Sequence, residues 1–340
     1  MSNPVLVDVS RGPLVEARHR GSVSVVDADG ATVLALGNVE GPVFPRSAVK
    51  GLQALPLVET GIADQFGLSD AELALACASH SGEPVHVEAA NSMLLKAGRE
   101  AGCLECGAHW PFAEAAARRL AASGDEPGAL HNNCSGKHAG FVCLSCGLHE
   151  DPAGYSRAEH LVQRTVRAAL EEVTGAAHRA ERAGIDGCSI PTYAVPLTAL
   201  ARGFARFGTG VGLSPDRAAA ARRLRRAVAE NPVMVAGTGR FDTAVAAALG
   251  ERAFAKVGAE GVYCAALPEL GLGLALKADD GGTRAAEVAM AALLLRFLPL
   301  EGEGRSTVAG LASPVLRNWN GLEVGALRPT PSLLGTEGDV

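Results

Sequence analysis

The chain has 340 residues, 48% of them hydrophobic and 20% charged, and a formal net charge of −6. This composition is that of a globular protein with one large domain or two ordinary ones. The negative charge argues against binding to nucleic acid or to an anionic membrane surface. The sequence contains no run of about 18 uninterrupted apolar residues, the length that spans a membrane. Residues 1–12 lack a basic region followed by an apolar one, so we expect no secretory signal and a cytoplasmic location.

β-Strands are predicted at the start of the chain. We expect a strand over residues 4–9. Residues 22–37 have the pattern of two strands around an Asp-Ala-Asp-Gly turn, which is typical of a β-hairpin. A helix is expected over residues 47–55, and Pro56 should end or kink it.

Helices are predicted for most of the middle of the chain. Ser69, followed three residues later by Glu72, forms a capping box for a helix that reaches Cys77. Ser214 and Pro215 are a strong helix start, and that helix should run to about residue 230. The spacing of apolar residues favours four further helices, over residues 84–99, 111–123, 157–173 and 195–207.

The C-terminal third returns to strands. Residues 251–257, 261–266 and 271–277 are short, apolar and punctuated by glycine, as strands are. Residues 284–298 are predicted to form a last amphipathic helix. The chain after Gly302 is expected to be loop-like, with residues 336–340 frayed.

This order of elements predicts two lobes. Strands and helices do not alternate regularly, which argues against a doubly wound parallel sheet. We expect the N-terminal hairpin and the C-terminal strands to form one antiparallel sheet, with a cleft between this sheet and a helical lobe. The predicted boundaries are residues 1–60 and 240–330 for the sheet lobe, 61–239 for the helical lobe and 331–340 for the tail.

The cysteine and lysine contents point to chemistry. In a chain of this size without an export signal, eight cysteines favour free thiols or a metal site over a disulfide framework. Only five of the 31 basic residues are lysines. A lysine amine can lose its proton, whereas a guanidinium hardly ever does, so the few lysines are candidate functional residues.

The first candidate motif is Ser47-Ala48-Val49-Lys50. Residues three apart share a helix face, and a buried lysine amine can take the proton of a serine hydroxyl. Penicillin-recognising serine enzymes use Ser-x-x-Lys in this way, and Lys256-Val257-Gly258 resembles their Lys-Thr-Gly element. The alternative for the first motif is a capped helix with a solvated lysine.

Three further segments concentrate polar side chains between ordinary stretches: residues 77–83, 131–138 and 184–191. Such a cluster after an apolar helix suits the edge of a cleft, although for residues 77–83 helix-terminal turn residues are the alternative. Cys134 and Cys188, in the last two segments, could jointly hold a soft metal such as zinc. Two buried thiols are the alternative for this pair.

Taken together, six segments resemble the rhizobial-type, or class 3, L-asparaginases, the thermolabile "asparaginase II" family. The resemblance covers roughly residues 8–330. It implies a serine-β-lactamase-like fold, similar to bacterial glutaminases: an α+β architecture with an antiparallel sheet flanked by helices and a mostly helical lobe. In chain order the segments are FPRSAVKGLQALPLVETG, ACASHSGE, HNNCSGKHAGF, GIDGCSIPTYAVPL, AENPVMVAGTGRFDT and KVGAEGVY.

The resemblance assigns catalytic residues to this chain. The family's first serine–lysine pair falls on Ser47 and Lys50. Its second pair falls on Ser79 and Lys256, with Lys277 as the other candidate for the lysine.

The resemblance also implies a metal site and substrate contacts. The metal site has an unusual lysine ligand, which must be neutral to bind, and a dication and burial both favour the neutral amine. The implied zinc ligands are Cys134, Lys137 and Cys188. The implied substrate-binding residues are Arg46, His80, Asn133, His138 and Asp186.

The implied reaction is hydrolysis of the side-chain amide of L-asparagine to L-aspartate and ammonia. Ser47 attacks, neutral Lys50 moves the proton, and backbone N–H groups near Ser47 and at residues 258–260 stabilise the oxyanion. Ser79 as the nucleophile stays open. Zinc would place the substrate rather than take part in the chemical step.

Three other functions remain possible from the sequence. A glutaminase differs by one methylene in its substrate, which a pocket discriminates by only ~1–3 kcal/mol. A serine hydrolase of the same fold could act on β-lactams or peptides, but the absence of an export signal disfavours it. A non-catalytic zinc- or ligand-binding protein is disfavoured by the intact serines and lysines. A homodimer is the assembly that the resemblance implies.

Overall fold

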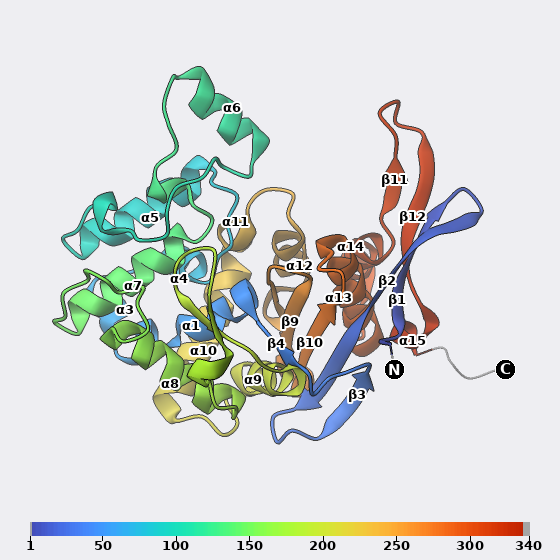
Figure 1. Cartoon of the computed structure of the whole chain (residues 1–340), viewed down its shortest axis with the longest axis horizontal. Coiled ribbons are helices and arrows are strands. Elements are labelled where there is room, and N and C mark those ends of the chain that lie inside the picture. Colours follow the sequence, from blue (N-terminus) through green and yellow to red (C-terminus); the bar gives the residue numbers. More distant parts are fainter. Residues whose placement is uncertain (1, 336–340) are drawn as a thin grey trace.

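The computed structural model describes residues 2–335 of the chain. Helices cover both faces of a curved antiparallel sheet, and most of the helices before residue 240 gather on one side of it (Figure 1). The predicted α+β class, with one antiparallel sheet made from N- and C-terminal strands, is confirmed. The lobe boundaries stay a prediction. Residues 336–340, for which fraying was expected, lie outside the described residues.

The main sheet has eight strands in the order β11-β12-β1-β2-β10-β9-β8, with β3 beside β2. β2 pairs antiparallel with β10 and thereby joins the N-terminal hairpin to the C-terminal strands. The pairs β4–β7 and β5–β6 form two small sheets. The strands are β1 (Val5–Arg11), β2 (Leu14–Asp27), β3 (Thr32–Leu36), β4 (Pro42–Val43), β5 (Ala183–Ile185), β6 (Pro191–Tyr193), β7 (Val195–Pro196), β8 (Phe254–Val257), β9 (Val262–Leu267), β10 (Leu272–Ala278), β11 (Val315–Arg317) and β12 (Glu323–Pro329).

The helices follow the predicted order with changed bounds. A 3₁₀ turn, η1 (Arg46–Val49), precedes the first of them. They are α1 (Lys50–Gln53), α2 (Leu55–Glu59), α3 (Ile62–Gln65), α4 (Asp70–Ala76), α5 (Pro84–Lys96), α6 (Glu114–Ala122), α7 (Ser135–Gly147), α8 (Leu161–Thr174), α9 (Leu197–Thr209), α10 (Pro215–Glu230), α11 (Pro232–Ala236), α12 (Phe241–Leu249), α13 (Thr283–Phe297), α14 (Gly302–Ala312) and α15 (Pro331–Leu334).

Local side-chain chemistry explains why several predicted elements form. The Ser69 side chain accepts from the Glu72 N–H, and the Glu72 carboxylate accepts from the Ser69 N–H, so the predicted capping box of α4 is present. Ser214 caps α10, with Pro215 at its first position. In the β2–β3 turn, Asp27 Oδ1 accepts three successive backbone N–H groups. Each signal acts over a few residues, which is why it could be predicted.

The segment after Gly302 was predicted incorrectly as a loop. It forms α14, β11, β12 and α15. β12 pairs antiparallel with β1, and Leu327 from β12 is buried against the sheet's core. This pairing joins residues more than 300 positions apart, so no local pattern shows it.

One helical prediction also needs correction. The helix expected over residues 47–55 is divided into η1, α1 and α2, and Pro56 lies in the first turn of α2 rather than at a helix end. The polar segment 131–138, to which no secondary structure was assigned from sequence, runs into the buried helix α7 at Ser135. Small residues allow that burial: a Cβ added at Gly136 would lie 2.5 Å from Leu75 O.

Helices pack on both faces of the main sheet. α9 contacts β10 and β2 on one face, and α13 contacts β10, β9 and β1 on the other. Close packing of α9 depends on Gly273 of β10, because a Cβ there would lie 1.9 Å from Ala201 O. The two faces belong to two hydrophobic cores, one extending into the helical part and one under α13.

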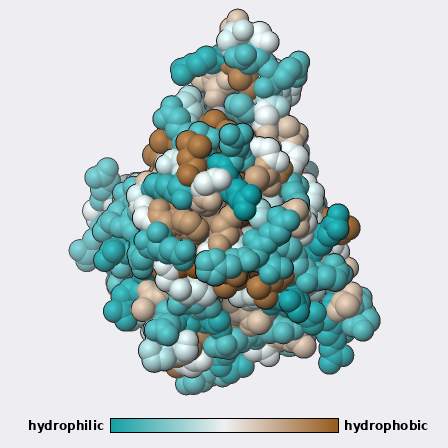
Figure 2. All heavy atoms as spheres, turned by 90° about the vertical axis from the view of Figure 1, so that its left-hand side faces the viewer, coloured by the Kyte–Doolittle hydropathy of each residue, from teal (hydrophilic) through white to brown (hydrophobic). Residues whose placement is uncertain are grey.

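α6 stands away from the rest of the molecule (Figure 1). Seen from the side in Figure 2, this end forms a narrow projection, and small hydrophobic groups are scattered over a largely hydrophilic surface. None of the residues of α6 is buried. Within residues 2–335, every helix is too short or too polar to cross a bilayer.

Substitution of Gly273 by alanine should destabilise the fold. The new Cβ must displace the α9 backbone, and overpacking of this kind costs about 1–3 kcal/mol. Gly310→Ala is the matched control, because Gly310 lies in α14 with open space around it. The control should be neutral or stabilise by up to about 1 kcal/mol. Urea unfolding of both variants measures the difference, and equal midpoints would contradict the close-packing argument.

Candidate active site

Three of the five lysines are almost completely buried. Lys50, Lys137 and Lys256 are 1%, 2% and 0% exposed. Lysine is rarely buried without partners, since removing an ammonium ion from water costs several kcal/mol. These are the three lysines to which the sequence analysis gave roles. Their partners therefore define the site.

The Lys50 amine contacts the serine from the second predicted pair. Lys50 Nζ lies 3.0 Å from Ser79 Oγ, 2.6 Å from Ala78 O and 3.1 Å from Cys134 Sγ. Ser79 follows α4 and is 7% exposed. Ser47 lies on the same helical turn as Lys50 but makes no side-chain hydrogen bond to it. Among the described residues, the Lys50 amine thus hydrogen-bonds to Ser79 and not to Ser47, and the pairing of Ser47 with Lys50 in catalysis stays a prediction.

Ser47 is half-buried and lies beside a strained residue. Arg46 has φ +50°, in the left-handed region that non-glycine residues seldom adopt. Within the described chain, the Ser47 N–H and the Ala259 N–H donate to no protein acceptor. The Gly258 N–H is unavailable, because it donates to Val262 O at 2.7 Å. Among the backbone groups expected to bind an oxyanion, the N–H groups of Ser47 and Ala259 are thus free, and that of Gly258 is not.

Gly258 brings these two segments together. A Cβ at Gly258 would lie 2.6 Å from Pro45 O and 3.2 Å from the Ala48 Cβ. The absence of a side chain lets the end of β8 approach the turn that carries Ser47. The free N–H groups of the two segments therefore lie on neighbouring pieces of backbone.

Lys256 contacts an aspartate rather than Ser79. Its Nζ donates to Asp242 Oδ2 at 3.1 Å and to Val257 O at 3.0 Å. Burial lowers the pKa of Lys256, and Asp242 opposes the shift. No hydrogen bond joins Ser79 and Lys256 among the described residues, and their pairing stays a prediction. The other candidate, Lys277, is half-buried and donates to Glu260 O and Ala278 O.

Asp242 is a site residue that the sequence analysis did not identify. Tyr263 also donates a hydrogen bond to this carboxylate. On α13, Glu287 lies near enough to be affected by its charge: burial raises the pKa of Glu287 to about 7, Asp242 adds to the shift, and Arg240 opposes it. Asp242 lies in one of the six segments that carry the family resemblance, but it precedes Lys256 by 14 residues, and no local signal links the two.

Cys134 and Cys188 behave as a coupled thiol pair. A hydrogen bond from Cys188 holds the pKa of Cys134 well below its usual value, burial opposes this, and the Lys50 and Lys137 charges assist it. The pKa of Cys188 is raised for the complementary reason. The thiolate form is thus favoured at Cys134 over Cys188. All eight cysteines of the chain are free.

The pair and Lys137 form a donor set suited to a soft metal. Lys137 Nζ lies 3.0 Å from Cys188 Sγ. Burial disfavours the Lys137 charge, but Cys188 and Cys134 outweigh burial and raise the pKa of Lys137. A metal would have to displace that proton. Within residues 2–335, no group of three or more His, Cys, Asp or Glu side chains forms an alternative metal site.

The predicted substrate-binding residues have different surroundings. Arg46 Nε donates to Asp186 Oδ1 at 2.7 Å. Asn133 lies between His109 and the Cys134 sulfur. His80 is fully buried, and Ser135 and the Gly82 N–H occupy both of its ring nitrogens. This arrangement argues against the predicted contact of His80 with substrate.

His138 has one free ring nitrogen. Tyr155 Oη accepts from the Glu105 N–H, so its own proton is left to donate to His138 Nδ1 at 2.7 Å. Burial and the Lys137 and Lys50 charges hold the pKa of His138 well below its usual value. The neutral ring then carries its proton on Nε2, which is buried and has no partner among the described residues. An unsatisfied donor of this kind is suited to a ligand.

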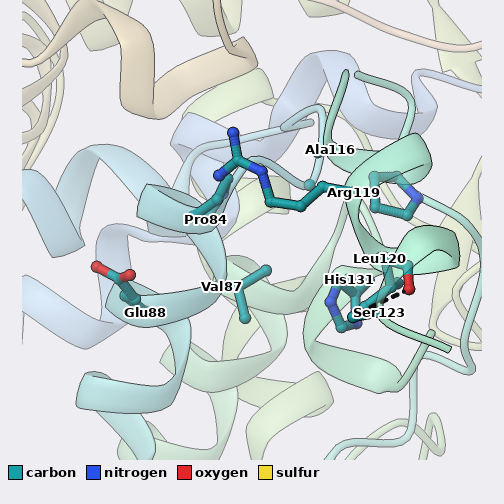
Figure 3. Close-up of a pocket in the computed structure, with 10 residues that line it drawn as sticks. Pro84, Val87, Glu88, Ala116, Arg119, Leu120, Ser123 and His131 are labelled. Atoms are coloured by element: carbon teal, nitrogen blue, oxygen red, sulfur yellow. Dashed lines mark hydrogen bonds between the residues drawn. The ribbon is translucent and has the colours of Figure 1, made fainter. Parts of the chain in front are cut away.

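Two cavities flank this region. One of about 380 Å³ opens beside Arg46 and Lys277, and Glu260, another residue at positive φ, also lines it. The other, of about 240 Å³, lies between α5 and α6 (Figure 3). Its walls include Pro84, Val87 and Leu120, and none of the predicted site residues. The chemistry therefore lies nearer the first cavity.

Comparison with known proteins gives one family and a distant structural likeness. The family model described as L-asparaginase II matches residues 7–329. No curated protein matches the chain. Among solved structures, the chain is similar to the crystal structure of a provisionally assigned β-lactamase from Bacteroides dorei DSM 17855. The identity is 15%, the TM-score is 0.38, and the match covers 77% of this chain and 87% of that one. A likeness at this score carries no conclusion about chemistry.

Replacement of Glu287 by glutamine should stabilise the protein at alkaline pH. An unfolded glutamate has a pKa near ~4.3, and in the fold the value is about 7. The folded state therefore disfavours the ionised carboxylate, and wild type loses stability as the pH rises through this window. We expect the unfolding free energy of Glu287→Gln to exceed that of wild type by about 1–3 kcal/mol at pH 8, and by less at pH 5.

Denaturant unfolding at several pH values measures this difference. Glu303→Gln, at an exposed position on α14, is the control and should show no such trend. A pH-independent difference for Glu287→Gln would contradict the assigned cause.

Proposed function

The chain belongs to the L-asparaginase II family, as its six segments predict, and from that membership we propose that it hydrolyses L-asparagine to L-aspartate and ammonia. The family supports an asparaginase-type amidohydrolase acting on a small molecule. The proposal of serine–lysine catalysis on L-asparagine rests on one observation. The buried Lys50 amine contacts Ser79 Oγ and lies three residues after Ser47. In this proposal the protein acts in the cytoplasm on the free amino acid.

Ser47 is the nucleophile in the proposed reaction. Its Oγ attacks the side-chain amide carbon, and Lys50 as the neutral amine receives the hydroxyl proton and returns it to the departing nitrogen. Ammonia leaves, a β-aspartyl ester remains on Ser47, and water hydrolyses that ester. The partial exposure of Ser47 supports this choice, because Ser79 is buried. Ser79, in contact with Lys50, orients the amine and relays protons.

The negative charge that develops on the amide oxygen needs donors that are already in position. The free N–H groups of Ser47 and Ala259 are the candidates. One such donor typically contributes about 10²–10³ in rate. The backbone strain at Arg46 supports this assignment, since strained residues gather at sites whose geometry is imposed by function.

The substrate's charged groups need recognition as well. We assign this to Arg46, Asp186, Asn133 and the free Nε2–H of His138. In the same proposal Cys134, Lys137 and Cys188 hold zinc. A bound zinc ion would supply a positive charge that helps to place the α-amino and α-carboxylate groups, and the chemical step proceeds on the protein's own side chains. The assembly proposed is a homodimer.

The choice of nucleophile is testable. Wild type should release ammonia from L-asparagine faster than from L-glutamine, because the pocket discriminates one methylene. Ser47→Ala should reduce the turnover at least ~10³-fold, and Lys50→Met should do the same. Ser79→Ala should retain more activity, because a relay group contributes less than the nucleophile.

Mass spectrometry of an acid-quenched reaction identifies the serine that carries the β-aspartyl ester. An ester on Ser79 would reverse the two serine roles, which the Lys50–Ser79 contact makes the leading alternative. Equal release from glutamine would favour a glutaminase. If wild type released ammonia from neither amide, the proposed function would be wrong.

The zinc assignment is tested by metal content. Purified wild type should hold about one zinc ion per chain, and Cys134→Ser and Cys188→Ser should each lose most of it, because two of three protein ligands are thiols. Cys264→Ser is the matched control, at a buried thiol in β9 that makes no hydrogen bond to a lysine among the described residues. Full zinc in both site variants would contradict the assignment.

A further inference from the structure

Asp242 is a buried acidic residue outside the proposed mechanism. It is 3% exposed, at the start of α12. Its Oδ1 accepts from Tyr263 Oη, and its Oδ2 accepts from Lys256 Nζ and from the Val257 N–H. A buried carboxylate with three donors is held in one place. What the fixed carboxylate of Asp242 does depends on the positions of Tyr263, Lys256 and Val257, the residues that donate to it.

The carboxylate lies at the edge of the sheet. β8 is the last strand in the sheet order, so its outward N–H groups have no neighbouring strand. Val257 donates one of them to Asp242. Lys256 and Val257 point to opposite faces of β8, and Tyr263 packs in the core beneath α13. Asp242 thus links Tyr263, on the face of the sheet that α13 covers, to Lys256, on the opposite face.

The contacts leave one donor of Lys256 free. An ammonium group has three N–H donors. Asp242 and Val257 O take two of them. The third has no partner among the described residues. A side chain that is fixed by two hydrogen bonds presents its remaining N–H in a defined direction.

The charges around Lys256 come from several elements. Asp242 on α12 favours the ammonium form, whereas burial, Lys50 and Arg240 oppose it. The buried thiol of Cys77 lies close to Lys256, and burial raises the pKa of this thiol to about 12, so it stays neutral. Glu287 on α13 faces Asp242. Asp242 is therefore the direct anionic partner of Lys256.

We propose that Asp242 is a positioning residue that keeps Lys256 protonated and its free N–H directed into the active site. The proposal rests on the proposed asparaginase activity. It assigns to Lys256 the role of a fixed cation, instead of the neutral amine that the sequence analysis considered. The cation would attract a carboxylate or a developing oxyanion and orient Ser79. Tyr263 and the Val257 N–H fix the carboxylate that holds it.

The pH dependence of turnover distinguishes this role from a merely structural one. Asp242→Asn removes the charge that favours the Lys256 cation, so the alkaline limb of kcat/KM should move to lower pH, with a loss of at least ~10-fold near neutral pH. Asp64→Asn, at an exposed surface ion pair, is the control and should leave the profile unchanged. A folded Asp242→Asn enzyme with the wild-type alkaline limb would overturn the proposal.

Tyr263→Phe is the second variant, in case Asp242→Asn does not fold. It leaves the Lys256–Asp242 contact in place and removes one donor to Oδ1. The carboxylate then has one fewer hydrogen bond to fix it. We expect a smaller loss of kcat/KM with a shift of the acid or alkaline limb, and no effect on either would count against the proposal.

A spectroscopic readout separates this inference from the proposed function. The chain has only five lysines, so protein labelled with [¹⁵N]lysine gives few Nζ signals, and Lys256→Met identifies the one of interest. Asp242→Asn should move the titration of the Lys256 signal to lower pH. If wild type hydrolyses no asparagine but this shift occurs, the proposed function fails and the charge assignment stands. If wild type is active and the signal does not move, the inference alone fails.

Discussion

Burial of three lysine amines is the constraint on which the site depends. Lys50, Lys137 and Lys256 come from three different elements, and each finds its partners on segments distant in sequence. An unpartnered buried charge costs several kcal/mol, so the fold is favourable only when these segments converge. The same contacts that satisfy the amines also bring together the serines, the thiols and the carboxylates. Stability and the geometry for chemistry therefore arise from the same interactions.

The distance at which the covering segments pack on the sheet depends on the backbone as much as on the side chains. Gly273 lets α9 lie close against β10, and Gly258 lets the end of β8 approach the turn before Ser47. These glycines lie at the points where the sheet touches what covers it. The strained backbone at Arg46 and Glu260 flanks the same junction. Where two backbone segments meet without intervening side chains, their N–H groups stay accessible to a bound ligand. Larger side chains at the same positions would cover these groups.

Charges in the site are distributed unevenly, and this distribution limits the chemistry. Within the thiol pair the thiolate form is favoured at Cys134, which is adjacent to Lys50 and near Lys137. Asp242 compensates Lys256 separately, at the edge of the sheet. The cation-rich interior suits a substrate with a carboxylate and a reaction that develops an oxyanion. An amine that acts as a base must be neutral, a form that neighbouring cations favour and neighbouring anions oppose.

Short-range chemistry made much of this protein predictable before its structure. The capping box at Ser69, the turn at Asp27 and the motif at Ser47 each involve only a few neighbouring residues, so each can be recognised in the sequence. The antiparallel sheet followed from the order of the elements. Tertiary structure alone decided that Lys50 contacts Ser79, that Asp242 holds the Lys256 amine, and that β12 completes the sheet. These contacts join residues 14 to more than 300 positions apart, and the reach of a side chain across such a gap depends on how the elements pack.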